Sequence, residues 1–193
     1  MKKIILSLIM ILSLTSCVPV VIVGVVGAGV IITTSIINDQ RSFKIILEDR
    51  AIVSRAQSLM NEDPELQGHS HISVYSFNCV VLLVGQAQTP ELRARAFEIA
   101  SSVKYVQKVY NQIIISGVTT DLGRTDDAWI TSKVKSAMLD QDGLRSSQIK
   151  VITSNGVVYL MGWVTHSQAD LATNVARRVE GVQKVVKVFQ YQD

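Results

Sequence analysis

The chain has 193 residues, of which 19 are Lys or Arg and 16 are Asp or Glu. Without Lys2 and Lys3, which belong to the N-terminal segment described next, 17 basic residues face 16 acidic ones, so the net charge is about +1. This near balance, the absence of a basic run and an aromatic content of only 6% argue against a nucleic-acid-binding protein.

The N-terminus has the pattern of an export signal followed by a lipid anchor. Lys2 and Lys3 precede an apolar stretch at 4–14, which has the length of a signal-peptide core and is short for a membrane span. Leu14-Thr15-Ser16-Cys17 then resembles the bacterial lipobox, in which cleavage precedes the cysteine and the thiol is joined to diacylglycerol. We therefore expect a lipoprotein signal peptide at 1–16 and lipid attachment at Cys17. The alternative is an ordinary signal or an uncleaved anchor in which this cysteine is incidental.

The residue after the cysteine favours the outer membrane. An Asp there resembles the inner-membrane retention signal of enteric-type bacteria, whereas this chain has Val18. Several acyl chains would hold the protein at the periplasmic face of that membrane, because each buried CH₂ contributes about 0.8 kcal/mol. We interpret 17–42 as a lipidated apolar tether and linker, since Pro19 and three glycines within 18–32 disfavour a helix. A true membrane-spanning segment is the alternative.

The segment 43–116 has the pattern of a small folded unit of helices and strands. Helices are predicted at 43–60 and 92–103, and strands at 72–77, 80–84 and 106–115. Thr89 and Pro90 form a strong helix start, because Thr is a good N-cap and Pro suits the first helical position. The apolar stretch 80–84 is typical of a central strand covered on both faces. The candidate core residues of the first helix are Ile45, Ile52, Ala56 and Leu59.

Cys79 is expected to be a small buried side chain rather than a reactive thiol, since it stands at the edge of this apolar strand. With Cys17 lipidated, no disulfide within the chain is possible.

A second unit, 126–193, follows a linker at 117–125. Its helices are predicted at 127–139 and 167–179, and its strands at 149–154, 157–161 and 182–191. Thr125 or Asp126 would cap the first helix, and Gly181 suits the C-terminal cap of the second. Asn155-Gly156 predicts a type I′ hairpin turn, because both residues tolerate positive φ.

The second unit repeats the first. Asn78-Cys79-Val80-Val81-Leu82-Leu83-Val84-Gly85 corresponds to Asn155-Gly156-Val157-Val158-Tyr159-Leu160-Met161-Gly162, and Val106-Gln107-Lys108-Val109 returns as Val182-Gln183-Lys184-Val185. Asp49 returns as Asp127, and we match Lys104 to Gly181. The predicted fold class is α+β, with two tandem αββαβ domains that each place two helices on a three-stranded mixed sheet. A unit used twice behind one tether favours a binding module over a catalyst.

The pattern Val-x-Leu-x-Gly, then a helix, then Gly-Val-x-x-Val resembles the BON domain. The second unit carries it as Val157-Val158-Tyr159-Leu160-Met161-Gly162 and Gly181-Val182-Gln183-Lys184-Val185. Two such domains behind a lipobox are similar to the dual BON-domain outer-membrane lipoproteins. The resemblance implies a periplasmic lipoprotein that binds anionic phospholipid, supports outer-membrane integrity and is enriched at division sites. It also implies that the first helix of the second domain makes the lipid contact.

The residues of that helix point to the same surface. At about 100° per residue, Ile130, Val134 and Ala137 share a face that suits the core. An apolar ring and a Leu on the other side, bracketed by lysines, suit a lipid headgroup layer. The predicted phospholipid-binding residues are therefore Trp129, Ser132, Lys133, Lys135, Ser136 and Leu139. The first unit has Ala51, Ser54, Arg55, Gln57, Ser58 and Asn61 in their places, so we expect it to have a structural role or to face protein instead.

Three alternatives stay open for this surface and its function. Trp129 could pack against the first domain or the 117–124 linker instead of lipid. The same surface could serve a periplasmic adaptor that docks cell-wall, envelope-assembly or division-site proteins. The two domains could also form a scaffold that packs only on itself.

Catalysis, a metal site and a cofactor are not expected. His69 and His71 lack a second ligand pair for zinc, and His166 has no Asp placed to form a triad. Asp126 and Asp127 are better explained as helix caps than as an acid/base pair.

Overall fold

The structure is a computed structural model that describes residues 43–117 and 122–192, and these described residues belong to one compact unit. The predicted signal peptide, Cys17 and the apolar tether lie outside the described residues. None of the helices within the described ranges is long and apolar enough to cross a membrane.

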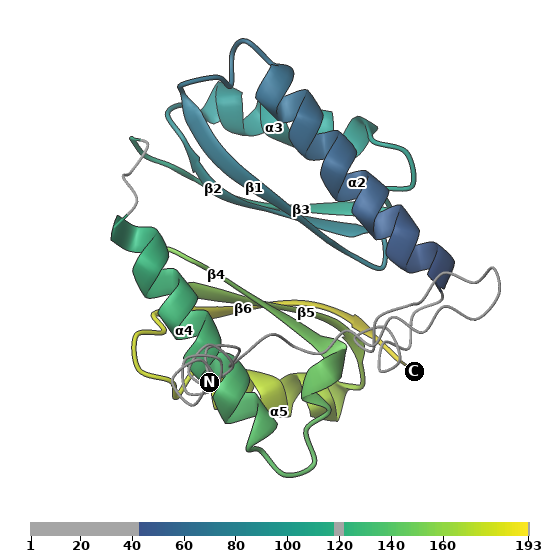
Figure 1. Cartoon of the computed structure of the whole chain (residues 1–193), viewed down its shortest axis with the longest axis vertical. Coiled ribbons are helices and arrows are strands. Elements are labelled where there is room, and N and C mark those ends of the chain that lie inside the picture. Colours follow the sequence, from purple (N-terminus) through teal and green to yellow (C-terminus); the bar gives the residue numbers. More distant parts are fainter. Residues whose placement is uncertain (1–42, 118–121, 193) are drawn as a thin grey trace, which may run out of the picture. The chain divides into compact units, whose positions relative to one another are not determined.

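The first repeat unit folds in the predicted order. Its elements are α2 (Phe43–Glu62), β1 (Ser70–Phe77), β2 (Val80–Ala87), α3 (Pro90–Ser102) and β3 (Lys108–Ile115). The sheet has the strand order β1-β2-β3, antiparallel between β1 and β2 and parallel between β2 and β3. Both helices cover one face of this sheet (Figure 1).

The second unit repeats this arrangement. Its elements are α4 (Leu122–Leu139), the 3₁₀ turn η3 (Ser146–Gln148), β4 (Ile149–Ser154), β5 (Val157–Val164), α5 (His166–Ala176) and β6 (Lys184–Tyr191). The order β4-β5-β6 is again antiparallel and then parallel, and the register is kept: Val81 pairs with Val109, and Val158 with Val185. The predicted α+β class, with two αββαβ units, is confirmed.

The predicted start of α3 is confirmed, whereas α5 begins one residue earlier than predicted. Thr89 caps α3 as predicted, since its hydroxyl accepts a hydrogen bond from the Leu92 amide at 3.4 Å and Pro90 opens the helix. In α5 the cap is Thr165, which accepts from the Gln168 amide at 3.3 Å, so the helix begins one residue before Ser167.

The prediction that Thr125 or Asp126 caps α4 is wrong, because the helix begins at Leu122. Asp127 lies inside the helix, where its carboxylate accepts hydrogen bonds from the Asn155 and Gly156 amides at 2.7 and 2.8 Å. Those amides belong to the left-handed turn of the β4–β5 hairpin, with φ values of 50° and 72°. Backbone N–H groups of a tight turn need a hydrogen-bond acceptor, and here the carboxylate of Asp127 on α4 provides it.

The first unit uses the same clamp in a more buried form. Asp49 accepts hydrogen bonds from the amides of Asn78 and Cys79, at 2.8 and 2.9 Å, and from the Ser76 hydroxyl at 2.6 Å. Asn78 and Cys79 have φ values of 51° and 63°, as in the second hairpin. The repeated aspartate therefore ties the first helix of each domain to its hairpin turn. Cys79 is buried, as predicted.

The end of α5 also differs from the prediction. The helix ends at Ala176 with Arg177 at its C-cap, three residues before the predicted end, and Gly181 is not its cap. Gly181 instead has φ +92°, and a Cβ there would lie 3.0 Å from the Ile130 side chain on α4. The corresponding left-handed residue of the first unit is Tyr105, with φ 74°, and not Lys104. The amides of Val106 and Val182, which follow these residues, bond alike to the carbonyls three residues before them.

Each domain has a core between its helices and its sheet. Ile52 and Ala56 are fully buried in the first core, as predicted, whereas Ile45 and Leu59 are only partly buried at its edge. The motif glycine of β5 marks a close approach, because a Cβ at Gly162 would lie 2.7 Å from the Gln148 carbonyl oxygen. This close approach leaves no room for a side chain at this position of β5.

A third core lies on the faces of the two sheets that carry no helix. It contains Val80, Leu82, Val84, Ile152, Tyr159, Met161 and Val188. This confirms that 80–84 belongs to a central strand buried on both faces, and it identifies the second cover as the other sheet. A polar contact borders this core: the side-chain Nδ2 of Asn78 donates a hydrogen bond to the side-chain Oε1 of Gln190 at 2.6 Å.

Candidate membrane-binding surface

The packing of α4 against its sheet decides which side chains it presents outward. Ile130, Val134 and Met138 are buried in the second core. Met138, not the predicted Ala137, completes this face, and Ala137 is only half-buried at its edge. Spacings of four residues repeat one helical face, so residues about half a turn away must point to solvent.

Two large apolar side chains lie on that outward face. Trp129 is 65% exposed and Leu139 is 74% exposed, which confirms that the indole points out of its domain. This exposure does not fit the alternative in which Trp129 packs against the first domain. Ser132, Lys135 and Ser136 are exposed between the two apolar residues.

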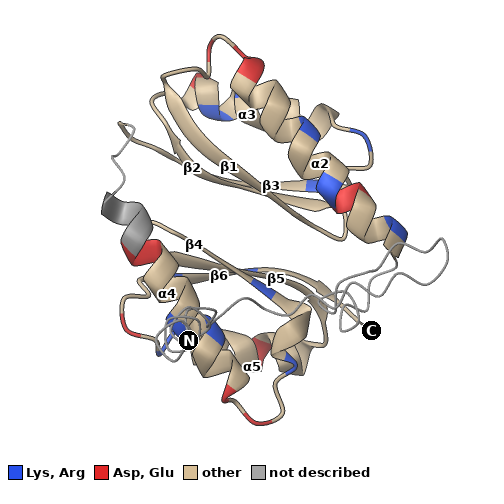
Figure 2. Cartoon of the chain, viewed as in Figure 1, with Lys and Arg blue, Asp and Glu red and all other residues tan. Residues whose placement is uncertain are grey.

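The two lysines of the surface differ in their surroundings. Lys133 is half-buried, with its ammonium 3.6 Å from a Glu180 carboxylate oxygen and 5.7 Å from the centroid of the Trp129 ring. Lys135 is exposed and lies on the other side of the helix, where it lines a groove beside β4. Figure 2 shows acidic residues near the start of α4 and basic residues in its second half. Glu180 therefore offsets part of the charge that Lys133 offers, while Lys135 faces solvent.

The corresponding face of α2 is polar. Gln57, which replaces Lys135, donates hydrogen bonds to the Ile72 carbonyl at 3.2 Å and to the Asn61 side chain at 3.1 Å. Ser58 donates to Glu62 one turn along. Ala51, Ser54 and Arg55 are exposed. In the first domain, these positions carry no large apolar side chain. The side-chain amides of Gln57 and Asn61 form hydrogen bonds within the domain.

Sequence analysis missed an apolar surface at the start of α2. Phe43 is 51% exposed and Leu47 is 46% exposed. They lie four residues apart, on a side of the helix different from that of the buried Ile52 and Ala56. The signal in the sequence was this pair of apolar residues outside the core stripe.

The residues set aside as metal or catalytic candidates have structural contacts. The His69 ring bonds to the Gln88 side chain at 3.1 Å, and the His166 ring stacks on Tyr191 with 3.8 Å between centroids. In the part of the chain that the structure describes, no three His, Cys, Asp or Glu side chains gather as a metal site would require.

Comparison with known proteins places these features in a family. The BON domain family matches residues 48–117 and 126–193. The chain is 32% identical over 172 residues to the outer membrane lipoprotein DolP of Haemophilus influenzae, over 89% of each chain. It is 36% identical over 154 residues to the 21 kDa hemolysin of Actinobacillus pleuropneumoniae, over 79% of each chain. It is 28% identical over 142 residues to the osmotically-inducible protein Y of Escherichia coli, over 72% of this chain and 70% of that protein.

Among solved structures, the C-terminal domain of CdsD, a structural protein of the type III secretion system of Chlamydia trachomatis, is similar at 20% identity over 75% of this chain and 67% of its own. Its TM-score of 0.29 is too low to support an argument about fold or function.

Proposed function

Because the chain belongs to the BON domain family, we propose that it is a non-catalytic envelope lipoprotein that binds anionic phospholipid through α4 and supports envelope integrity. The relatives described above are named as a lipoprotein, a hemolysin and an osmotically-inducible protein, not as enzymes. The similarity to an outer membrane lipoprotein over 89% of both chains confirms the predicted outer-membrane location. Lipidation at Cys17 and a periplasmic orientation belong to the proposal.

The observation that carries the lipid proposal is the shared exposure of Trp129 and Leu139 on one face of α4. Ten residues of helix separate them by about 15 Å, so the two side chains could enter a membrane interface at two points. An indole is favourable at such an interface, because its ring leaves water while its N–H stays hydrated. Lysines beside anionic lipid contribute about 1 kcal/mol each, and Lys135 is exposed to do so.

A weak contact of this kind would be sufficient behind a lipid anchor. Two apolar side chains and one or two lysines give modest affinity for a protein that approaches from solution. Acyl chains on Cys17 would hold the domains at one leaflet, so the local concentration of lipid would replace intrinsic affinity. We therefore expect α4 to orient the tethered domains and not to recruit them.

The experiment uses the fragment 38–193, which contains all three cores and should fold without the tether. We expect it to bind phosphatidylglycerol micelles weakly, and Trp129→Ala to weaken binding at least about tenfold, which corresponds to about 1.4 kcal/mol. The matched control is Trp163→Ala, which removes a 42% exposed indole from β5 and should leave binding unchanged. Equal binding by wild type and Trp129→Ala, or equal losses in both variants, would reject α4 as the site.

A protein adaptor that uses the same surface is the alternative. An exposed Trp is also typical of protein interfaces, where Trp is enriched at hot spots. Amide shift mapping by NMR during the micelle titration separates the two functions. Shifts centred on 127–140 support the lipid site, whereas an unchanged spectrum supports a polypeptide partner.

A further inference from the structure

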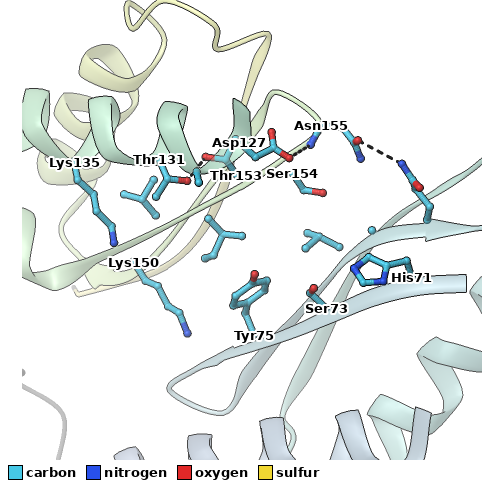
Figure 3. Close-up of a pocket in the computed structure, with 16 residues that line it drawn as sticks. His71, Ser73, Tyr75, Asp127, Thr131, Lys135, Lys150, Thr153, Ser154 and Asn155 are labelled. Carbon is cyan, nitrogen blue, oxygen red and sulfur yellow. Dashed lines mark hydrogen bonds between the residues drawn. The ribbon is translucent and has the colours of Figure 1, made fainter. Parts of the chain in front are cut away.

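A groove of about 430 Å³ lies beside α4 and reaches the edge of the third core, because Val84 and Ile152 are part of its lining. Side chains from α4 and β4 line one wall, and side chains from β1 line the other (Figure 3). Small-molecule sites in proteins commonly have volumes of about 300–1,000 Å³, so the groove can hold a polar group the size of a lipid headgroup.

Two lysines from neighbouring elements project into this groove. Lys135 comes from α4 and Lys150 from β4 (Figure 3). The Lys150 ammonium lies 3.3 Å from the Ser76 carbonyl oxygen and 5.4 Å from the centroid of the Tyr75 ring, which places it toward the β1 wall. The carboxylate in the lining, Asp127, is bound to the Asn155 and Gly156 amides. The lining therefore has an excess of positive charge, even with Asp127 counted.

Neutral polar groups surround the two ammonium groups. Thr131 and Thr153 bond to each other at 2.7 Å across α4 and β4, and Ser73, Tyr75 and His71 face them from β1. Lysines attract a phosphate as point charges, while hydroxyl and imidazole groups can bond to ester oxygens and to sugar or glycerol hydroxyls. This combination suits a phosphate ester that carries hydroxyl groups.

We propose that the groove binds the phosphate-bearing headgroup of an anionic phospholipid whose acyl region lies against Trp129 and Leu139. The inference rests on the proposed membrane contact and gives it a headgroup subsite. Lys135 and Ala128 connect the two, because they are exposed on α4 and also line the groove. A lipid seated on the outward face of α4 could therefore place its phosphate between Lys135 and Lys150.

The first domain offers a contrast within the same chain. A hollow of about 270 Å³ lies beside α2, with Gln57 and Asn61 in its lining. This lining, among the described residues, contains no lysine or arginine. The position of Lys135 is taken by Gln57, and the position of Lys150 by Ser73. At the positions of both groove lysines, the first domain thus carries a neutral residue.

Lys150→Gln is the informative change, because Lys150 lies on β4 and not on the outward face of α4. We expect sn-glycerol 1-phosphate to shift the amide signals of Lys150, Thr131 and His71 in fragment 38–193, and Lys150→Gln to weaken this binding about tenfold. Lys150→Arg keeps the charge and should bind within about threefold of wild type. Lys184→Gln removes an exposed lysine from β6 and should change nothing. Unchanged melting temperatures would show that these variants fold.

Vesicles distinguish a lipid headgroup from a free phosphate. With phosphatidylglycerol and phosphatidylcholine vesicles, Lys150→Gln should reduce the preference for the anionic lipid several-fold, while residual binding through Trp129 persists. Loss of glycerol phosphate binding without a change in vesicle preference would mean that the groove takes free phosphate esters, which overturns the lipid assignment. Equal titrations for wild type and Lys150→Gln would overturn the groove itself. Either result leaves the Trp129→Ala test of the membrane contact intact.

Discussion

α2 and α4 hold the same place in their domains and are anchored in the same way, yet they present different surfaces. Each packs an apolar face on its own sheet and uses an aspartate, Asp49 or Asp127, to bind the turn of its hairpin. Outward, α4 exposes Trp129 and Leu139, whereas the matching positions of α2 carry Ala51 and Asn61. A duplicated domain can keep the contacts that fold it while its solvent face changes freely, because surface substitutions cost little stability.

The shared aspartate clamp should be unequal in strength between the copies. Asp49→Ala removes three hydrogen bonds to a buried carboxylate, so we expect a loss of about 3 kcal/mol in unfolding free energy. Asp127→Ala removes two bonds at a half-exposed site and should cost about 1–2 kcal/mol. Urea unfolding of fragment 38–193 measures both. Asp126→Ala, at the exposed neighbouring residue, is the control, and a larger cost for Asp127→Ala than for Asp49→Ala would contradict the comparison.

Substitutions at the left-handed residue after the second helix of each domain should change stability in opposite directions. Gly181→Ala places a Cβ at φ +92° and 3.0 Å from Ile130, so it should destabilise the protein by about 1–2 kcal/mol. Tyr105→Gly relieves a non-glycine residue at φ 74° and should stabilise the protein by up to about 1 kcal/mol, because Tyr105 is 48% exposed and its removal costs little packing. Thermal melts of both variants check the signs. Destabilisation by both changes would mean that the two loops are not equivalent.

Acid should weaken the first domain more than the second, because the first domain contains the buried carboxylate of Asp63. Burial opposes ionisation of Asp63, but hydrogen bonds from Arg95 at 2.9 Å and from the Leu66 and Glu65 amides hold its pKa below the usual value. A lowered folded-state pKa contributes stability above the unfolded pKa and loses it as the pH falls further. We therefore expect melting temperature to fall below about pH 4, and Asp63→Asn to lower it at pH 7 but flatten this decline.

Asp170→Asn serves as the comparison in the second domain. Lys187 bonds to Asp170 at 2.7 Å and lowers the pKa of that carboxyl, but both side chains are exposed. Solvent and salt screen such a pair, so its removal should change the acid profile less than Asp63→Asn does. An equal effect of the two variants would remove the distinction between the domains.

The sequence was sufficient for the features that depend on local periodicity. Ile130 and Val134 fix the rotation of α4, so the outward position of Trp129 followed from 3.6-residue spacing alone. The role of Asp127 could not be predicted from this spacing. Its hydrogen-bond partners lie 28 and 29 residues away, in a hairpin turn whose position relative to the helix depends on packing. An aspartate near a predicted helix start suggests an N-cap, but α4 begins at Leu122, so Asp127 lies inside the helix.

The groove could not be predicted from the sequence, because it also depends on contacts between segments far apart in the chain. The apolar run 80–84 indicated a strand covered on both faces but not which element covers the second face. Lys150 and Tyr75 come together only because the two sheets share a core, and each belongs to a strand whose alternation gives no sign of the other. Contacts between repeats carry no periodic signal within either repeat.

A triple variant that transfers the surface of α4 to α2 tests the comparison of the two helices most directly, although its expected effect is the smallest. Ala51→Trp, Gln57→Lys and Asn61→Leu place the side chains of Trp129, Lys135 and Leu139 at the matching positions. In the Trp129→Ala background, we expect this triple variant to recover phosphatidylglycerol binding only a few-fold. Gln57→Lys loses the bond to the Ile72 carbonyl, and the hollow beside α2 has no counterpart of Lys150. Adding Ser73→Lys to supply that charge is not equivalent, because Ser73 already lines the groove of the second domain. Full recovery by the triple variant would mean that exposed side chains alone define the site, and no recovery would mean that α4 depends on its groove.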